Sequence, residues 1–158
     1  EDVPALRSLQ HWKLSGMESR QNTNPPVALP QWRELQAAAR SVRDKAWAPY
    51  SRYQVGAAVL TSDGRIVAGC NVENVSYGLT ICAERAAVCT AIAQGCSSFT
   101  AICISSTGIP VPCGACRQVL AEFNQDMLVL LDDVHHAADI MPELVRLEEL
   151  LPRAFRLF

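Results

Sequence analysis

Residues 99–131 read FTAICISSTGIPVPCGACRQVLAEFNQDMLVLL, and this stretch decides the fold of the protein. Two short apolar runs, Phe99–Ser105 and Met127–Leu131, predict strands, and Gly114–Phe123 between them predicts a helix. This alternation of strand and helix continues through the middle of the chain. We therefore expect an α/β fold, a three-layer α/β/α sandwich around a mixed central sheet of about five strands.

The segments on either side extend the same alternation. Apolar residues recur at spacings of three and four from Trp32 onward, which predicts an amphipathic helix that begins after Pro30. This helix should end near Trp47, because Pro49 disfavours helix at the residue before it. The other expected elements are two hairpin strands, a helix, a short strand and a final helical turn: Tyr53–Leu60, Arg65–Val72, Cys82–Gln94, Glu143–Arg146 and Leu147–Leu151. The hairpin strands are rich in Val, Ile and Ala and should be buried on both faces.

Length and composition indicate one globular domain. The chain has 158 residues, of which 49% are hydrophobic and 19% charged, and this length leaves little room for a second domain. No run of about 18 apolar residues occurs, so we expect no membrane span. A net charge of −2 offers no basic face to nucleic acid. Residues 1–30 contain four prolines and no signal-peptide core, and predict a flexible extension ahead of a domain at residues 31–158.

Cysteine is unusually frequent, with seven residues against three histidines. An odd number in a chain of this length disfavours a fully paired disulfide scaffold and favours a reducing compartment, which predicts a cytoplasmic protein. Four of the seven lie among apolar neighbours and are expected to be buried and inert: Cys70, Cys89, Cys96 and Cys103.

The other three cysteines belong to two motifs, Cys82-Ala83-Glu84-Arg85 and Pro112-Cys113-Gly114-Ala115-Cys116, each at the start of a predicted helix. The free N–H groups and the dipole at a helix N-terminus favour thiolate over thiol. Cys113 and Cys116 should lie on one helix face, about one turn apart. If the two helix ends converge, three sulfurs can bind one zinc ion.

Three protein ligands leave the fourth position of a tetrahedral zinc open to water, as in a catalytic site. Glu84 lies two residues beyond Cys82 and is the expected proton shuttle for that water. Three thiolates on Zn²⁺ carry a net charge of −1. Arg85 is the cation expected to offset this charge, with Arg117 as a weaker choice.

Other interpretations of the thiols stay open at this point. A structural zinc site would need a fourth ligand, for which His135 or His136 is available, and Cys113 with Cys116 could instead form a redox pair. Three buried cysteines without a metal are a further alternative. The paired pattern of Cys-x-Glu and Pro-Cys-x-x-Cys, with 28 residues between Glu84 and Cys113, favours catalytic zinc and is the signature of zinc deaminases.

Over roughly residues 31–156, the chain resembles the cytidine deaminases of the small homotetrameric type. The resemblance rests on five blocks, which are APYSRYQVGAA (48–58), NVENVSYG (71–78), TICAER (80–85), PCGACRQV (112–119) and ELLPRAF (149–155). It implies zinc-dependent hydrolysis of cytidine and 2′-deoxycytidine to uridine and 2′-deoxyuridine plus ammonia, in pyrimidine salvage, by a homotetramer with one Zn²⁺ per chain. Residues 31–158 would then be the catalytic domain.

The resemblance also implies roles for particular residues. Cys82, Cys113 and Cys116 match the zinc ligands, and Glu84 matches the general acid/base. The positions that match contacts to the nucleoside are Asn71 and Glu73 for the ribose, Tyr53 for the base or sugar, the backbone at Ala83 for the base, and Phe155, an aromatic lent to a neighbouring subunit, with Phe158 as its substitute. Arg153 departs from the family, which commonly has glycine there.

Two alternative functions remain. Blasticidin-type deaminases share the Cys-x-Glu and Pro-Cys-x-x-Cys core, so a related nucleoside analogue is one alternative substrate. A non-catalytic, zinc-stabilised interaction domain is the other, and it would keep its metal without turning over any substrate.

Overall fold

The computed structural model describes residues 30–156. The expectations of a flexible extension at the N-terminus and of a role for Phe158 concern positions that lie outside these residues, except for Pro30. Within them the elements are α1 (Trp32–Arg43), β1 (Gly56–Thr61), β2 (Ile66–Cys70), a 3₁₀ turn η1 (Tyr77–Leu79), α2 (Ala83–Ala93), β3 (Phe99–Ser106), α3 (Gly114–Phe123), β4 (Leu128–Asp133), β5 (Glu143–Arg146) and α4 (Leu147–Leu150).

The five strands form one mixed sheet in the order β2-β1-β3-β4-β5. β1 pairs antiparallel with β2 and with β3, β3 pairs parallel with β4, and β4 pairs antiparallel with β5. The parallel pair β3 and β4 is joined through α3, as a crossover connection requires. This pair is the stretch 99–131 that predicted the α/β class, so the expected mixed sheet of about five strands is confirmed.

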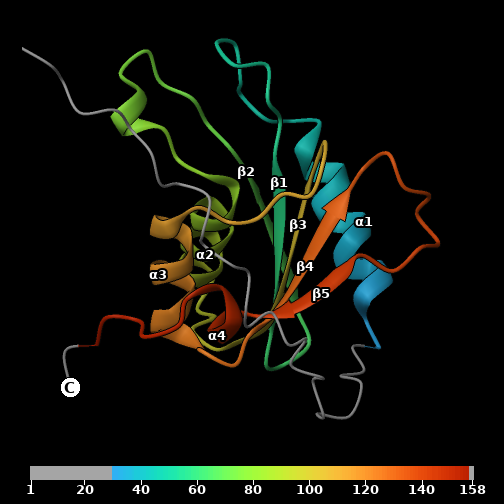
Figure 1. Cartoon of the computed structure of the whole chain (residues 1–158), viewed down its shortest axis with the longest axis vertical. Coiled ribbons are helices and arrows are strands. Elements are labelled where there is room, and N and C mark those ends of the chain that lie inside the picture. The colour runs from blue at the N-terminus through green and yellow to red at the C-terminus, as the bar shows by residue number, and fades with distance from the viewer. Residues whose placement is uncertain (1–29, 157–158) are drawn as a thin grey trace, which may run out of the picture.

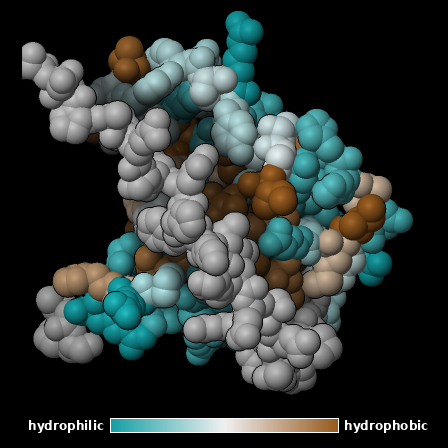
Figure 2. Space-filling view, in the orientation of Figure 1, coloured by the Kyte–Doolittle hydropathy of each residue, from teal (hydrophilic) through white to brown (hydrophobic). Residues whose placement is uncertain are grey.

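The helices cover both faces of the sheet, which confirms the three-layer sandwich (Figure 1). α1 lies on one face over a core that includes Leu35, Ala39 and Leu130. α2 and α3 lie on the other face, over a larger core that includes Phe99 and Leu120. In Figure 2, hydrophobic residues are visible near the centre of this side of the molecule, and hydrophilic residues lie toward its upper and right-hand edges. None of the helices within residues 30–156 is long and apolar enough to cross a membrane.

Two glycines let the helices approach the sheet closely. A Cβ at Gly56 in β1 would lie 2.0 Å from the carbonyl oxygen of Ala39 in α1. A Cβ at Gly69 in β2 would lie 2.3 Å from the backbone nitrogen of Ala87 in α2. Both distances are far below van der Waals contact, so only glycine allows these backbones to meet. The second contact fixes how deeply α2, which begins with the Cys82 motif, lies on the sheet.

All the predicted helices and strands are present, but the ends of several differ where tertiary hydrogen bonds compete with the local pattern. The first helix ends at Arg43 rather than near Trp47, because the Trp47 N–H donates to the carbonyl of Asn71 at 3.0 Å. The strand expected from Tyr53 begins at Gly56. Its partner ends at Cys70 and not at Val72, which instead forms isolated bridges with Trp47 and Ile81. The 3₁₀ turn η1 was not predicted from the sequence.

Burial corrects two further expectations. β1 is buried along its whole length, but β2 is an edge strand in which only alternate residues are buried, so it is not enclosed on both faces. Cys96 and Cys103 are buried as expected. Cys89 is exposed and Cys70 is half-buried, because the first points outward from α2 and the second ends the edge strand.

A buried polar network joins α1 to the parallel pair of strands. The carboxylate of Asp132, which is 1% exposed, accepts hydrogen bonds from Arg40 Nε and Nη2, both at 2.7 Å, from Gln36 Nε2 at 2.8 Å and from Ser105 Oγ at 2.7 Å. These four donors match the roughly four acceptor sites of a carboxylate. Burial raises the pKa of Asp132, but the bonds from Arg40, Ser105 and Gln36 outweigh it and leave this pKa lowered.

We expect Asp132→Asn to destabilise the fold by about 2–3 kcal/mol at neutral pH, because it removes the charge that satisfies Arg40 in a buried network. The folded pKa of Asp132 is lowered, so its stabilisation is present above the unfolded pKa of about 3.9 and is lost as the pH falls through the folded pKa. Urea unfolding at fixed chain concentration should therefore show a gap between wild type and variant that narrows in acid. Asp139→Asn, at an exposed position, is the control, and a gap independent of pH would contradict the assignment.

Candidate active site

Three cysteine sulfurs meet where two helices begin on the same side of the sheet. Cys82 is the N-cap residue of α2, Cys113 is the N-cap residue of α3, and Cys116 lies in the first turn of α3. Their Sγ atoms all lie within 4.8 Å of one another. Cys116 is fully buried, Cys82 is half-buried and Cys113 is exposed. The convergence of the two helix N-termini, on which a three-sulfur site depends, is therefore present.

The sulfurs of Cys82 and Cys116 differ in how readily they carry a negative charge. A hydrogen bond with the Cys116 thiol, together with nearby Arg85, lowers the pKa of Cys82 to about 5. The same hydrogen bond and burial raise the pKa of Cys116. Arg85 Nη2 lies 3.5 Å from Cys82 Sγ and donates to the Thr80 carbonyl at 3.0 Å. The guanidinium is thus anchored beside a sulfur that readily carries negative charge.

The donor set fits zinc. Thiolate sulfur is a preferred zinc ligand, and three protein ligands leave one tetrahedral position open. Neither His135 nor His136 belongs to the group of three potential ligands that the structure brings together within residues 30–156. The alternative of a structural site closed by one of these histidines is therefore not supported by the geometry.

Glu84 lies in the first turn of α2, two residues from Cys82, and is 5% exposed. Burial raises the pKa of its carboxyl group. A raised pKa makes the carboxylate a better proton acceptor than an exposed one, which suits a general acid/base. The side chain lines the same cavity as Cys82 and Cys113.

Asn71 lies just after β2 and is 7% exposed. Its side-chain oxygen accepts from the Val55 N–H at 2.8 Å, and its side-chain nitrogen donates to the Tyr53 carbonyl at 2.9 Å. These bonds replace ladder pairing at residues 53–55, which explains why β1 begins only at Gly56. One N–H of the Asn71 amide then remains for another partner.

Glu73 lies two residues further on and is 9% exposed. One carboxylate oxygen accepts from the backbone N–H groups of Tyr50 and Ser51, at 2.9 and 3.3 Å, and the other accepts from the Ser51 hydroxyl. The bond from the Ser51 hydroxyl is the largest cause of the lowered pKa of Glu73, and the two backbone bonds lower this pKa further. Partial burial acts in the opposite direction but does not outweigh them. Glu73 is therefore held as an anion.

One cavity of about 270 Å³ collects most of these groups. Its lining includes seven positions that the sequence marked for metal, catalysis or substrate: Tyr53, Asn71, Glu73, Cys82, Ala83, Glu84 and Cys113. Four further lining residues had no predicted role: Ser51, Val55, Thr80 and Val111. Ser51 and Val55 stand inside the block 48–58 that resembles the family, and this was the signal in the sequence that pointed to them.

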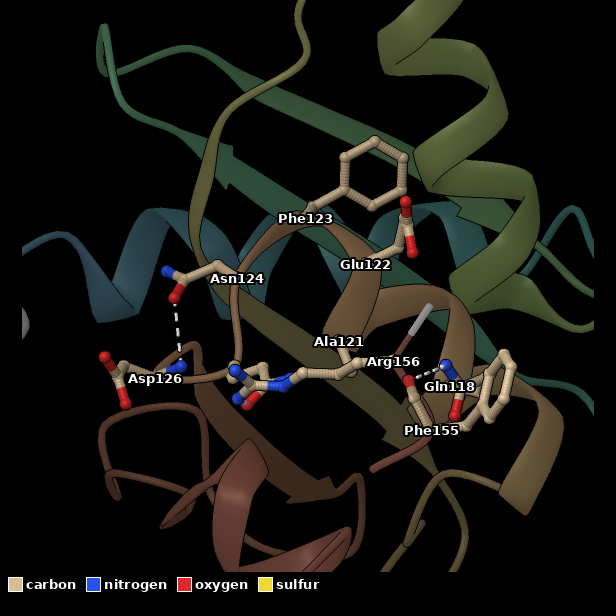
Figure 3. Close-up of a pocket in the computed structure, with 9 residues that line it drawn as sticks. Gln118, Ala121, Glu122, Phe123, Asn124, Asp126, Phe155 and Arg156 are labelled. Carbon is tan, nitrogen blue, oxygen red and sulfur yellow. Dashed lines mark hydrogen bonds between the residues drawn. The ribbon is translucent and has the colours of Figure 1, made fainter. Parts of the chain in front are cut away.

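Three predicted site residues do not line the cavity. Cys116 and Arg85 lie next to Cys82, as described above, whereas Phe155 is elsewhere. Figure 3 shows Phe155 in a separate cleft between α3 and the C-terminal segment, where its carbonyl accepts from Gln118 Nε2 at 3.2 Å. The residue is 73% exposed, and it is not one of the residues that line the cavity of its own chain. Arg153, two residues before Phe155, has φ 61°, in the left-handed region that glycine favours. The turn before Phe155 therefore keeps this backbone although arginine stands where the family commonly has glycine.

The fold and the site define an α/β protein with a buried carboxylate beside three cysteine sulfurs that could hold a zinc ion. Comparison with known proteins then gives the family. The model of the cytidine and deoxycytidylate deaminase zinc-binding region matches residues 31–131. The chain belongs to this family, and it binds one zinc ion.

Individual relatives agree with this assignment. A cytidine deaminase of Mycobacterium tuberculosis is 44% identical over 129 residues, which cover 79% of this chain and 96% of that protein. One from Halalkalibacterium halodurans is 48% identical over 120 residues, covering 74% and 88%. The crystal structure of cytidine deaminase from Burkholderia pseudomallei superposes with a TM-score of 0.71 at 43% identity, covering 77% of this chain and 97% of that one.

Proposed function

We propose that the protein catalyses the hydrolytic deamination of cytidine and 2′-deoxycytidine to uridine and 2′-deoxyuridine, with release of ammonia, in pyrimidine salvage. One observation carries the proposal. A single cavity brings the sulfurs of Cys82 and Cys113 and the buried carboxylate of Glu84 together with Asn71 and Glu73. Groups suited to hold a metal, to move a proton and to bind a sugar would therefore face one molecule bound in this cavity. The acidic net charge of −2 also favours a free nucleoside over a nucleic acid.

Cys82, Cys113 and Cys116 would hold the zinc ion, and Arg85 would offset the excess negative charge of three thiolates. When bound, zinc lowers the pKa of water and so supplies a nucleophile at neutral pH. Cys113 is exposed and lines the cavity, whereas Cys116 is buried and does not line it, which supports a metal held at the cavity wall.

Glu84 would move the protons of the reaction. Its carboxylate would take a proton from the attacking water and deliver it to N3 of the pyrimidine. It would then carry the proton of the new C4 hydroxyl to the amine, which leaves as ammonia as the C4 carbonyl of the uridine forms. Ala83 is the first residue of α2, so its N–H has no partner within the helix. Ala83 lines the cavity, and this N–H would orient the base.

Asn71 and Glu73 would bind the ribose, and Tyr53 would contact the base or the sugar. The free N–H of Asn71 supplies a donor, and Glu73 supplies an acceptor. Tyr53 is 44% exposed at the cavity wall, so its ring is available to a ligand rather than packed in the core.

The proposed active species is a cytoplasmic homotetramer whose catalytic domain is residues 31–158, with residues 1–30 as an extension. Several large apolar side chains are exposed on this chain, which supports self-association; they include Trp47, Val75, Tyr77, Leu79, Ile109 and Phe155. Phe155 would then reach the cavity of a neighbouring subunit. All seven cysteines are free, which supports a reducing compartment.

We expect the purified, zinc-loaded protein to convert cytidine and 2′-deoxycytidine, followed by the ultraviolet change and by ammonia release, and to sediment as a tetramer at the assay concentration. Cytidine 5′-phosphate and blasticidin are the competing substrates to be measured beside them. No turnover of cytidine at full zinc occupancy would favour the interaction domain. A strong preference for the phosphorylated substrate or for the analogue would change the choice among deaminases, and an active monomer would contradict the shared site.

A further inference from the structure

The loop of residues 48–52 is built around the Glu73 carboxylate. The loop is closed by the Arg52 N–H, which donates to the Ala48 carbonyl at 3.1 Å, and Arg52 has φ 59°, in the left-handed region. This backbone turns the N–H groups of Tyr50 and Ser51 toward one carboxylate oxygen of Glu73. A non-glycine residue at positive φ is unfavourable and persists only where its surroundings hold it. Here the buried carboxylate provides that hold.

The Ser51 hydroxyl adds a second link, and it joins two cavity residues. It donates to the other carboxylate oxygen of Glu73 and accepts from the Tyr53 N–H at 3.0 Å. Ser51, Tyr53 and Glu73 all line the cavity. One hydroxyl therefore sets the position of Glu73 relative to Tyr53, although they are twenty residues apart in the sequence.

Glu73 and Asn71 have little hydrogen-bonding capacity left for a ligand. An ionised carboxylate has about four acceptor sites, and the three donors from Tyr50 and Ser51 leave about one on Glu73. The Asn71 amide has two N–H groups, and its bond to the Tyr53 carbonyl leaves one. One acceptor and one donor suit a single hydroxyl group, which can donate to the first and accept from the second.

We propose that Ser51 is a positioning residue whose hydroxyl holds Glu73 with its last acceptor site toward the sugar, so that the discrimination between nucleosides with and without a free 3′-hydroxyl depends on Ser51. This proposal rests on the proposed deamination of cytidine. A substrate without that hydroxyl leaves the acceptor on Glu73 unpaired, and such a loss at a buried polar group is costly. The Ser51 hydroxyl also lowers the pKa of Glu73, which keeps the carboxylate an acceptor only.

The test compares cytidine with 3′-deoxycytidine, because the two share the reacting base and differ only in the hydroxyl at issue. Wild type should favour cytidine in kcat/KM by about tenfold or more, as expected for a hydrogen bond to a charged group. Ser51→Ala should raise KM for cytidine about tenfold, change kcat by less than about threefold, and bring the two substrates close together. Ser51→Thr keeps the hydroxyl and should restore the discrimination.

Two further variants separate hydrogen bonding from packing and from general damage. Ser51→Cys has nearly the size of serine but is a weak donor, so it should behave as Ser51→Ala does, and it serves if the alanine variant does not fold. Ser97→Ala, at an exposed position between α2 and β3, should match wild type in both substrates.

The possible results separate a failure of the Ser51 role from a failure of the proposed cytidine deamination. If Ser51→Ala and Ser51→Cys keep the full preference for cytidine, or lose rate equally on both substrates, Ser51 has no positioning role and the proposal is overturned while deamination stands. If wild type and Ser97→Ala turn over neither substrate, both proposals are overturned. Loss of the preference in the alanine and cysteine variants, with its recovery in the threonine variant, supports the role of Ser51.

Discussion

Glu84→Gln is expected to lower kcat for cytidine by at least about a thousandfold, which lies within the usual contribution of general acid–base catalysis. The amide has nearly the shape of the carboxyl group but can neither accept nor return a proton at neutral pH. Glu84 is not one of the three grouped sulfur ligands, so the zinc content should stay at about one per chain. Steady-state rates and metal analysis on the same preparation measure both quantities.

Glu122→Gln is the matched control, because it makes the same chemical change at an exposed position on α3. It should keep the wild-type rate. The unfolding midpoint of Glu84→Gln should not fall, since the substitution removes a carboxyl whose burial is unfavourable to its charged form. A Glu84→Gln variant with more than about a tenth of the wild-type rate would exclude the proton-transfer role, because general acid–base groups contribute more than this.

Cys116→Ala is expected to abolish zinc binding and activity together. Cys116 is fully buried and lies within 4.8 Å of both other sulfurs, so water cannot readily take the place of its thiolate. Loss of the metal removes several kcal/mol of catalytic stabilisation, which corresponds to more than about a thousandfold in rate. The variant should also unfold at a lower temperature, because bound metal stabilises the folded state.

Cys96→Ala is the matched control for this variant, since it removes another buried thiol at the far end of α2. It should keep one zinc per chain and nearly full activity, with a loss of about 1 kcal/mol of stability from the small cavity it leaves. Retention of stoichiometric zinc by Cys116→Ala would contradict the three-sulfur site. In that event another group would have to complete the coordination.

Ser51 and Phe155 show where prediction from the sequence reached its limit. Both stand in blocks that resemble the family, but only Phe155 had an expected role. In the structure Phe155 lies outside the cavity of its own chain, and Ser51 lines it with three hydrogen bonds to its neighbours. The bonds of Ser51 depend on the left-handed backbone at Arg52 and on a carboxylate 22 residues away. No local pattern of residues encodes such a contact.

By itself, the sequence determined the α/β class, the order of the elements and the chemistry at the two helix N-termini. These follow from short-range rules, because the strand–helix–strand alternation at 99–131 and the spacing of Cys113 and Cys116 act within a few residues. The tertiary structure alone decided that Cys82 meets those two sulfurs, because the close contact of α2 with Gly69 sets the depth of that helix. It likewise decided the ends of β1 and the arrangement around Glu73. In each case hydrogen bonds between distant segments outweighed the weak local preference of the backbone.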